Sequence, residues 1–205
     1  GGDSDYLWGE YLCEEGIISD PVSFQKMNEY FYQQYEIGKL DIYAWAEFSF
    51  KVLTEYSLDK LNDLRQNFIQ QKIEPIFLEK AQRFINQHKE NGDTVLVITA
   101  SNTFITSPIA KIYGINHLLA TEPEFKDGRY TGKVSGIPCF QSGKIDNSMP
   151  WMDKQNENLK GSYFYSDSHN DLPLLELVDN PVAINGDPRL TAVANENGWP
   201  NLDWR

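Results

Sequence analysis

Residues 162–176 read SYFYSDSHNDLPLLE, and this stretch decides which fold the sequence favours. Its apolar run, residues 162–166, stops at Asp167, and a second carboxylate, Asp171, follows four residues later. Short and nearly uninterrupted apolar runs are typical of parallel strands, which are covered on both faces. The stretch therefore predicts a buried strand whose carboxyl end carries two carboxylates.

Working outward from this strand, the chain alternates short apolar runs with helical patterns. Two more runs predict buried strands, residues 94–99 (TVLVIT) and 181–185 (PVAIN). The intervening segments predict helices at residues 105–113, 149–157, 172–178 and 189–197. Such alternation favours a parallel α/β sheet. Residues 124–136, which contain Asp127-Gly128, predict a small hairpin.

Residues 4–91 have a different pattern, with apolar and aromatic side chains three and four positions apart. Gly16, Asp20-Pro21, Gly38 and Pro75 divide this region into four or five predicted helices. We therefore expect a mostly helical domain at residues 1–75 and an α/β domain at residues 76–205.

Composition excludes several classes of protein. The net charge of −12 argues against nucleic-acid binding, which needs a basic face to replace the counterions of phosphates. No apolar run reaches the roughly 20 residues that span a membrane, so we expect no membrane partner. The first residues have no secretory pattern, which predicts a cytoplasmic protein. The chain has two cysteines, which indicate neither a disulfide framework nor a zinc site.

Polar residues at strand ends are the first candidates for a site, because ligands of open parallel sheets bind there. Thr99, Ser101 and Asn102 follow the first predicted strand, where hydroxyls and backbone N–H groups suit a phosphate oxygen. The alternative is that one of them only caps the next helix.

The second strand end carries Asp167, Asn170 and Asp171, which are oxygen ligands of the kind that Mg²⁺ prefers. A helix cap is again the alternative. We expect His169 to be a solvent-facing loop residue. Lys144 begins a predicted helix between the two strands; it could offset phosphate charge, although a lone lysine is usually a surface residue.

Taken in order, ITAS (residues 98–101), Gly143-Lys144 and YSDSHNDLPLLE (residues 165–176) resemble three motifs of the haloacid dehalogenase superfamily. They are similar to its second, third and fourth motifs, and the phosphoserine phosphatase branch is the most similar. This resemblance implies a three-layer, Rossmann-like parallel core with an inserted helical cap.

The resemblance also implies roles for individual residues. Thr99 would bind a phosphoryl oxygen, Lys144 would stabilise the nucleophile and the transition state, and Asp171 would orient Lys144 or support the metal. Asp167 would ligate Mg²⁺. The residues expected to contact substrate are Asp3, as the partner of an ammonium group, and Ser101, Asn102 and Asn170.

Two features of the helical region concern the substrate. Arg65 is a candidate partner for a substrate carboxylate, with a surface role as the alternative. The many aromatic side chains here are interpreted mostly as core packing.

The first motif of the family, Asp-x-Asp-x-Thr at the end of a strand, does not occur in residues 1–205. Its first aspartate attacks phosphorus and its second is the general acid and base. Asp3-Ser4-Asp5 has no strand before it, so we interpret it as a helix start. We expect the first core strand to lie upstream of residue 1.

The predicted function is a Mg²⁺-dependent phosphomonoesterase that acts through an aspartyl-phosphate. Its expected partner is a small, amino-containing phosphorylated metabolite, of the phosphoserine or histidinol-phosphate type. The alternatives are a phosphate-binding protein without a nucleophile and a phosphotransferase to an alcohol acceptor. The sequence does not indicate an oligomeric state.

Overall fold

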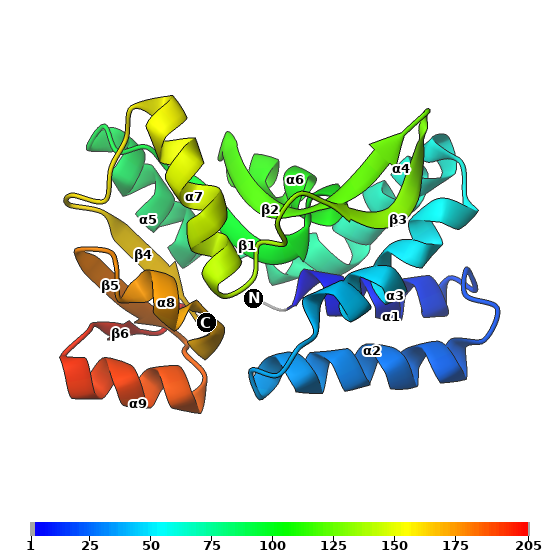
Figure 1. The fold of residues 1–205 in the computed structure, drawn as a ribbon, viewed down its shortest axis with the longest axis horizontal. Helices are drawn as coiled ribbons and strands as arrows, with labels where there is room; N and C mark the ends of the chain where they lie inside the picture. Colours follow the sequence, from blue (N-terminus) through cyan, green and yellow to red (C-terminus); the bar gives the residue numbers. More distant parts are fainter. Residues whose placement is uncertain (1–2, 205) are drawn as a thin grey trace.

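Five α-helices occupy the first part of the chain, and aspartates begin three of them. The computed structural model describes residues 3–204 (Figure 1). Asp3, Asp20 and Asp41 accept hydrogen bonds from backbone N–H groups that a helix start leaves unpaired. The helices are α1 (Ser4–Glu14), α2 (Pro21–Glu36), α3 (Ile42–Glu55), α4 (Leu58–Phe68) and α5 (Glu79–Glu90), with a π turn η1 (Ile69–Ile73) and a 3₁₀ turn η2 (Glu74–Ile76) before α5. The predicted number of helices is confirmed.

The six strands found in residues 3–204 form two separate three-stranded sheets, in the orders β1-β2-β3 and β4-β5-β6. β1 pairs in parallel with β2, and β2 pairs antiparallel with β3; β4, β5 and β6 are all parallel. The strands are β1 (Leu96–Asn102), β2 (His117–Lys126), β3 (Arg129–Ser135), β4 (Tyr163–Ser166), β5 (Asn180–Ile184) and β6 (Asn201–Leu202).

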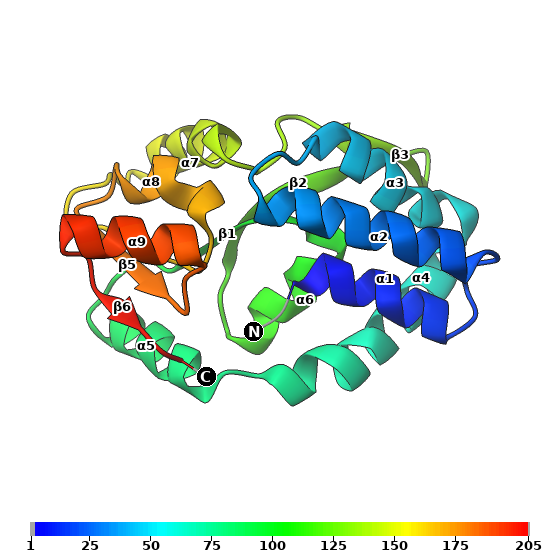
Figure 2. The same cartoon turned by 90° about the horizontal axis from the view of Figure 1, so that it is seen from below.

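Helices connect these strands as the alternating pattern predicts. They are α6 (Thr103–Ile112), α7 (Ser142–Gln155), the 3₁₀ turn η3 (His169–Asp171), the short α8 (Leu172–Leu175) and α9 (Pro188–Asn197). α6 follows β1, α8 lies between β4 and β5, and α9 precedes β6. Figure 2 shows α5 and α7 on opposite sides of the sheet that contains β5. This half of the molecule therefore has the expected three layers.

The predicted elements differ from the structure at several boundaries. The hairpin is confirmed, with Lys126 opposite Arg129. β1 begins and ends later than predicted, because its ladder continues to Asn102, opposite Thr121. The first half of β2 and all of β6 were not predicted. α7 joins the helix predicted to begin at Lys144 and the one predicted at residues 149–157. It begins at Ser142, directly after Gln141, whose φ of 47° turns the chain into the helix.

The hydrophobic core is divided into two clusters. The larger one joins α1, α3 and α4 to α6, through residues such as Phe50, Phe68 and Ile105. The smaller one lies between β5, α8 and α9 around Leu175 and Leu190. Against expectation, the apolar residues of β1 from Leu96 to Ile98 are only half-buried, because a cleft runs beside this strand.

Two composition-based expectations can be compared with the described part of the chain. Residues 3–204 contain no helix that is long and apolar enough to cross a membrane. Cys13 and Cys139 are free thiols, and burial raises the pKa of Cys139 to about 11. A buried thiol of this kind remains protonated and unreactive at neutral pH.

Candidate active site

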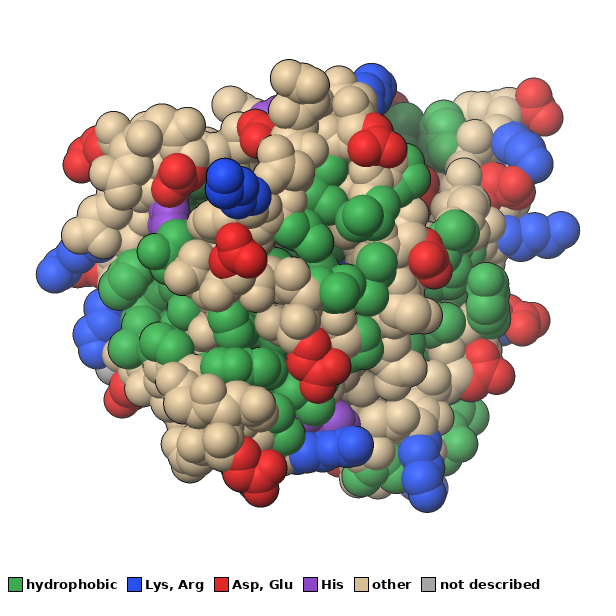
Figure 3. Space-filling view, turned by 60° about the vertical axis from the view of Figure 1, so that its left-hand side comes forward, with side chains coloured by type: hydrophobic (Ala, Val, Ile, Leu, Met, Phe, Trp, Pro, Cys, Tyr) green, Lys and Arg blue, Asp and Glu red, His purple; other side chains and the backbone are tan. Residues whose placement is uncertain are grey.

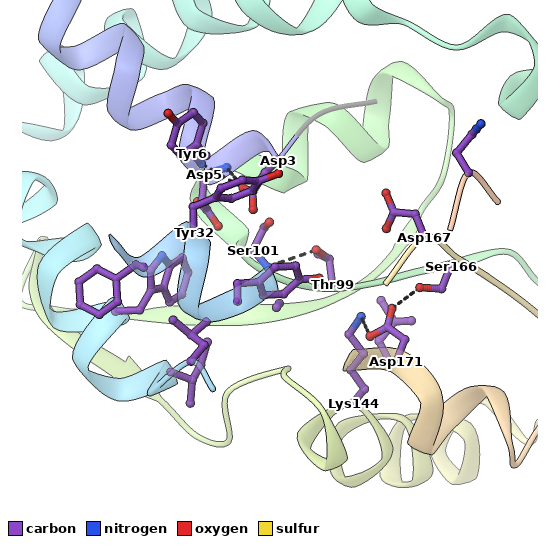
Figure 4. Close-up of a pocket in the computed structure, with 18 of the residues that line it drawn as sticks. Asp3, Asp5, Tyr6, Tyr32, Thr99, Ser101, Lys144, Ser166, Asp167 and Asp171 are labelled. Atoms are coloured by element: carbon purple, nitrogen blue, oxygen red, sulfur yellow. Dashed lines mark hydrogen bonds and ion pairs between the residues drawn. The ribbon is translucent and has the colours of Figure 1, made fainter. Parts of the chain in front are cut away.

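A pocket of about 330 Å³ lies at the carboxyl ends of β1 and β4, where the helical half faces the strands. Thr99 and Ser101 come from β1, Ser166 and Asp167 from the end of β4, and Lys144 from α7. Figure 4 shows Thr99 and Ser101 between two groups of side chains, those of α1 and α2 on one side and those around Asp167 on the other. The fold thus brings together the two strand ends that the sequence identifies.

Lys144 and Asp171 form a buried ion pair in this pocket. The lysine Nζ lies 2.5 Å from Oδ1 of Asp171, and the two side chains are 5% and 8% exposed. The Ser166 hydroxyl donates a hydrogen bond of 2.6 Å to the other carboxylate oxygen. The surface role that was the alternative for Lys144 does not occur, and the carboxylate fixes the direction of the ammonium group.

The end of β1 presents two hydroxyl groups to the pocket. The Ser101 backbone N–H donates a hydrogen bond of 3.2 Å to Thr99 Oγ1, and the Ser4 hydroxyl lies 3.4 Å from that of Ser101. Hydroxyl and backbone donors at a strand end can bind the oxygens of a phosphate. Thr99 and Ser101 are therefore placed for the role that the resemblance implies.

Asp3 and Asp5 lie at the start of α1 and line the same pocket. Asp3 is the N-cap of α1, one residue before the predicted helix start, and accepts hydrogen bonds from the N–H groups of Asp5 and Tyr6. Asp5 accepts hydrogen bonds from the backbone and side chain of Asn102. Burial raises the pKa of both carboxyls, and Asp3 raises that of Asp5 further. Gly1 and Gly2, which precede Asp3, lie outside the described residues.

Asp167 differs from Asp171 in forming no ion pair with Lys144. The residue is exposed, but the protein atoms around its carboxyl and the charge of Asp171 raise its pKa, while the charge of Lys144 lowers it. The described residues contain no cluster of three or more metal-ligating side chains. Mg²⁺ often binds through one or two carboxylates, with water and phosphate as its other ligands. An exposed carboxylate that forms no ion pair within residues 3–204 and lines the same pocket as Thr99 fits that requirement.

The helical region contributes aromatic side chains that the sequence analysis assigned mostly to the core. Tyr6, Tyr32, Tyr35 and Trp45 line the pocket, and the rings of Tyr6 and Tyr32 are 4.9 Å apart. Burial and the charge of Asp171 hold the pKa of Tyr35 well above its ordinary value. The spacing of three and four residues could not show that these side chains face the pocket. Aromatic residues that face the core of a helical region have the same spacing.

Asn170 and His169 hold the helical region against the strand-rich half instead of lining the pocket. The Asn170 amide donates a hydrogen bond of 2.8 Å to the Tyr35 carbonyl and accepts one from Gln141. His169 was predicted to face solvent but is only 7% exposed. Its Nδ1 lies 2.8 Å from Asp187 Oδ2, and Gly38 packs over its other nitrogen.

Two other predicted substrate-binding residues do not line the pocket. Asn102 caps α6 by accepting a hydrogen bond from the Ile105 N–H group, which is the alternative considered from the sequence. Arg65 donates to the Phe104 carbonyl at 3.0 Å, and its guanidinium lies 4.4 Å from the centre of the Phe104 ring. The Asn102 and Arg65 side chains therefore contact other parts of the protein instead of facing the pocket.

The fold and the site together define a class of protein. An α/β sheet places two hydroxyls, a buried lysine–carboxylate pair and an unpaired carboxylate around one pocket. Phosphoryl transfer depends on positioning and on neutralising charge, and this set of groups can do both. The structure is thus that of an α/β protein equipped for phosphate chemistry.

Comparison with known proteins establishes the family. The family model for haloacid dehalogenase-like hydrolases matches residues 1–176, and the chain belongs to this family. A histidinol-phosphatase of Neisseria meningitidis is 39% identical over 207 residues, covering 99% of this chain and 93% of that protein. A phosphoserine phosphatase of Mycobacterium tuberculosis is 38% identical over 118 residues, 58% of this chain and 38% of that protein. The chain is a phosphatase of the haloacid dehalogenase type.

Solved structures support the same fold. A protein of unknown function from Bordetella pertussis superposes with a TM-score of 0.92 at 37% identity, covering 99% of this chain and 92% of that one. A phosphoserine phosphatase, solved as an analogue of its phospho-aspartyl intermediate, gives a TM-score of 0.69 at 16% identity, covering 100% and 87%. The predicted α/β core with an N-terminal helical region is confirmed.

Proposed function

We propose that the protein is a Mg²⁺-dependent phosphomonoesterase whose substrate is a small cationic phosphate of the histidinol-phosphate type. The observation that carries this choice is the charge of the pocket. Among the described lining residues the carboxylates are Asp3, Asp5, Asp167 and Asp171, whereas Lys144 is the one cation. Lys144 is already paired with Asp171. A pocket with this balance favours a substrate that brings a positive charge.

The same balance disfavours a substrate with its own carboxylate, such as phosphoserine. A carboxylate desolvated in a pocket needs a cation or several donors, and Arg65 is held at Phe104. The imidazole and ammonium groups of histidinol phosphate have counterparts here. Tyr6, Tyr32 and Trp45 offer aromatic rings to a planar heterocycle, and the half-buried Asp3 carboxylate suits an ammonium group.

Different residues of this chain have different roles at the phosphate group of the substrate. Thr99 and Ser101 bind a phosphoryl oxygen, while Lys144 offsets the charge that develops in the transition state. Asp167 holds Mg²⁺, which neutralises phosphate charge when it is bound. By family resemblance, the phosphoryl group passes to an aspartate of an Asp-x-Asp-x-Thr motif, which residues 1–205 do not contain.

The test compares kcat/KM for histidinol phosphate and phosphoserine, in a chain that carries the Asp-x-Asp-x-Thr strand. We expect histidinol phosphate to be preferred by at least about tenfold, because an unpaired carboxylate costs about 1–3 kcal/mol. Equal or reversed preference would overturn the substrate assignment. Turnover that is unchanged by Asp167→Asn would overturn the assignment of the metal site.

A further inference from the structure

Asp187 stands between β5 and α9, and its two carboxylate oxygens have different partners. Oδ1 caps α9 by accepting hydrogen bonds from the N–H groups of Arg189 and Leu190, at 3.0 and 2.8 Å. Two such bonds complete an ordinary helix cap, which is all that the sequence at this position indicates. Oδ2 and the backbone N–H of Asp187 point instead to the loop that carries the proposed metal ligand.

This second set of contacts holds residues 167–169. Oδ2 of Asp187 accepts a hydrogen bond of 2.7 Å from the His169 backbone N–H and lies 2.8 Å from Nδ1 of the His169 ring. Because a carboxylate only accepts, Nδ1 donates the second bond. The Asp187 backbone N–H donates a bond of 2.8 Å to the Asp167 carbonyl. Asp187 therefore holds the loop on both sides of Ser168.

The His169 ring has one hydrogen bond in residues 3–204, the one to Asp187. Its other nitrogen, Nε2, is buried and has no hydrogen-bond partner among these residues. Gly38 packs over that nitrogen, where a Cβ would lie only 2.9 Å away. A closely packed ring with a single hydrogen bond is oriented by that bond. Asp187 thus sets the place of the ring as well as that of the backbone beside it.

Asp167 depends on a contact from outside its own loop. The residue is exposed, whereas the four residues that follow it, 168–171, are buried. Lys144 pairs with Asp171 and does not fix the direction of Asp167. The bond from the Asp187 N–H to the Asp167 carbonyl fixes the backbone at the point where the exposed carboxylate leaves the buried loop.

We propose that Asp187 is a positioning residue for the Mg²⁺ site, which directs the Asp167 carboxylate into the pocket by holding the Asp167 carbonyl and both donors of His169. The inference rests on the proposed function in one point, that Asp167 binds Mg²⁺. Residues that orient metal ligands without touching the metal typically change metal affinity by about 10–100-fold when they are replaced. Asp187 has the contacts of such a residue.

An acidic cluster on the surface near α9 would interfere with a measurement of Mg²⁺ binding. Figure 3 brings forward the side of the molecule with α7, α8 and α9, and the acidic side chains of the described residues are scattered singly over that face. Residues 3–204 also contain no group of three or more metal-ligating side chains. We therefore expect binding of Mg²⁺ to report on the pocket.

The test measures the dissociation constant of Mg²⁺ by isothermal titration calorimetry, without substrate, in a chain that carries the Asp-x-Asp-x-Thr strand. In Asp187→Asn the amide oxygen can still cap α9, while the NH₂ group faces the two donors of His169. This variant should bind Mg²⁺ about 10–100-fold more weakly. Asp41→Asn is the matched control, because one oxygen of Asp41 caps α3 through two bonds in the same way. It should leave the constant unchanged.

A pair of His169 variants separates positioning from the charge of Asp187. His169→Asn keeps a side-chain N–H donor and should keep most of the Mg²⁺ affinity, whereas His169→Leu removes the donor and should bind about tenfold more weakly. Saturating Mg²⁺ should restore kcat in both Asp187→Asn and His169→Leu, which a general loss of folding would not allow.

Three results would overturn the proposal. The first is unchanged Mg²⁺ affinity in Asp187→Asn when Asp167→Asn abolishes binding, which would leave the proposed function standing. The second is a loss in Asp187→Asn with none in His169→Leu, because Asp187 would then act only through its charge. The third is unchanged Mg²⁺ binding in Asp167→Asn, which would overturn the proposed metal site together with the positioning role.

Discussion

Lys144 and Asp171 come from different elements, α7 and the turn η3, yet Nζ of one lies 2.5 Å from Oδ1 of the other in a buried setting. Neither charge has bulk water to stabilise it, so each depends on its partner. Removing one partner of such a pair leaves an uncompensated buried charge, which costs far more than losing the attraction itself.

Lys144→Met should therefore lower the free energy of unfolding by about 3–5 kcal/mol, as measured by urea denaturation at pH 7. The double variant Lys144→Met with Asp171→Leu should recover much of that loss, since no charge then remains unpaired. Arg83→Met is the matched control, because Arg83 pairs with Glu79 on the surface and should shift stability by less than about 1 kcal/mol. Additive losses in the double variant would show that the pair is not coupled.

The unpaired carboxylate of Asp167 gives a pH-dependent prediction. Its pKa in the folded protein is raised above the ordinary value of 3.8, so the folded state holds this proton more tightly than the unfolded state. Stability from this group is complete below pH 3.8 and is lost as the pH rises through the folded-state pKa. Asp167→Asn should make the stability decrease less as the pH rises. It should also remove the stabilisation that added Mg²⁺ gives the original protein.

Thermal unfolding from pH 4 to pH 8, with and without Mg²⁺, measures both effects. Asp3 and Asp5 also have raised pKa values, so part of the slope will remain in the variant. An unchanged response to Mg²⁺ in Asp167→Asn would place the metal elsewhere.

Gly38 gives a prediction about how the helical region is held over the pocket. Its φ is +71°, and a Cβ placed there would lie 2.9 Å from Nε2 of His169. Gly16 has almost the same φ, +67°, but a Cβ there would meet nothing within 4 Å. Both Gly→Ala substitutions carry the conformational cost of a left-handed residue, and only one disturbs the contact between the two halves.

We expect Gly38→Ala to lower the melting temperature more than Gly16→Ala, and to raise KM for the phosphate substrate. Scanning calorimetry and steady-state kinetics on the two variants measure this difference. Equal effects would mean that the contact between Gly38 and His169 does not hold the helical region in place.

Sequence patterns predicted the strand ends and the polar residues beside them, because these follow from local rules. The roles of Thr99 and Lys144 in phosphate binding came from the family resemblance and stay predictions. Asp167 and Asp171 stop an apolar run, and Lys144 follows a turn, so each is visible without long-range information. His169 could not be placed, since its burial depends on Asp187 and Gly38, which lie 18 and 131 positions away in the chain. The division into two sheets was also invisible, because an apolar run does not reveal how many neighbours a strand has.

Arg65 is another residue whose contacts could not be predicted from the sequence. An arginine in a helical region is compatible with a substrate carboxylate, and only the structure shows its guanidinium against Phe104. The pocket aromatics were missed for a related reason. Tyr32 and Tyr35 lie one helical turn apart, and either could have faced the core.

Asp3 has two roles that a conservative substitution can separate. It caps α1 and, by the proposed function, it binds the substrate ammonium group. Asn caps helices about as well as Asp, so Asp3→Asn keeps the cap and removes the charge. Asp41 caps α3 on the exposed surface in the same manner, which makes Asp41→Asn the matched control for capping alone.

Asp3→Asn should reduce kcat/KM for histidinol phosphate by about tenfold to a hundredfold, because a buried charge-assisted contact is worth about 1.5–3 kcal/mol. It should leave hydrolysis of p-nitrophenyl phosphate, which has no ammonium group, nearly unchanged, and Asp41→Asn should affect neither substrate. Both rates are measured in a chain that carries the Asp-x-Asp-x-Thr strand. An equal loss with both substrates would mean that Asp3 shapes the phosphate site instead of recognising the amine.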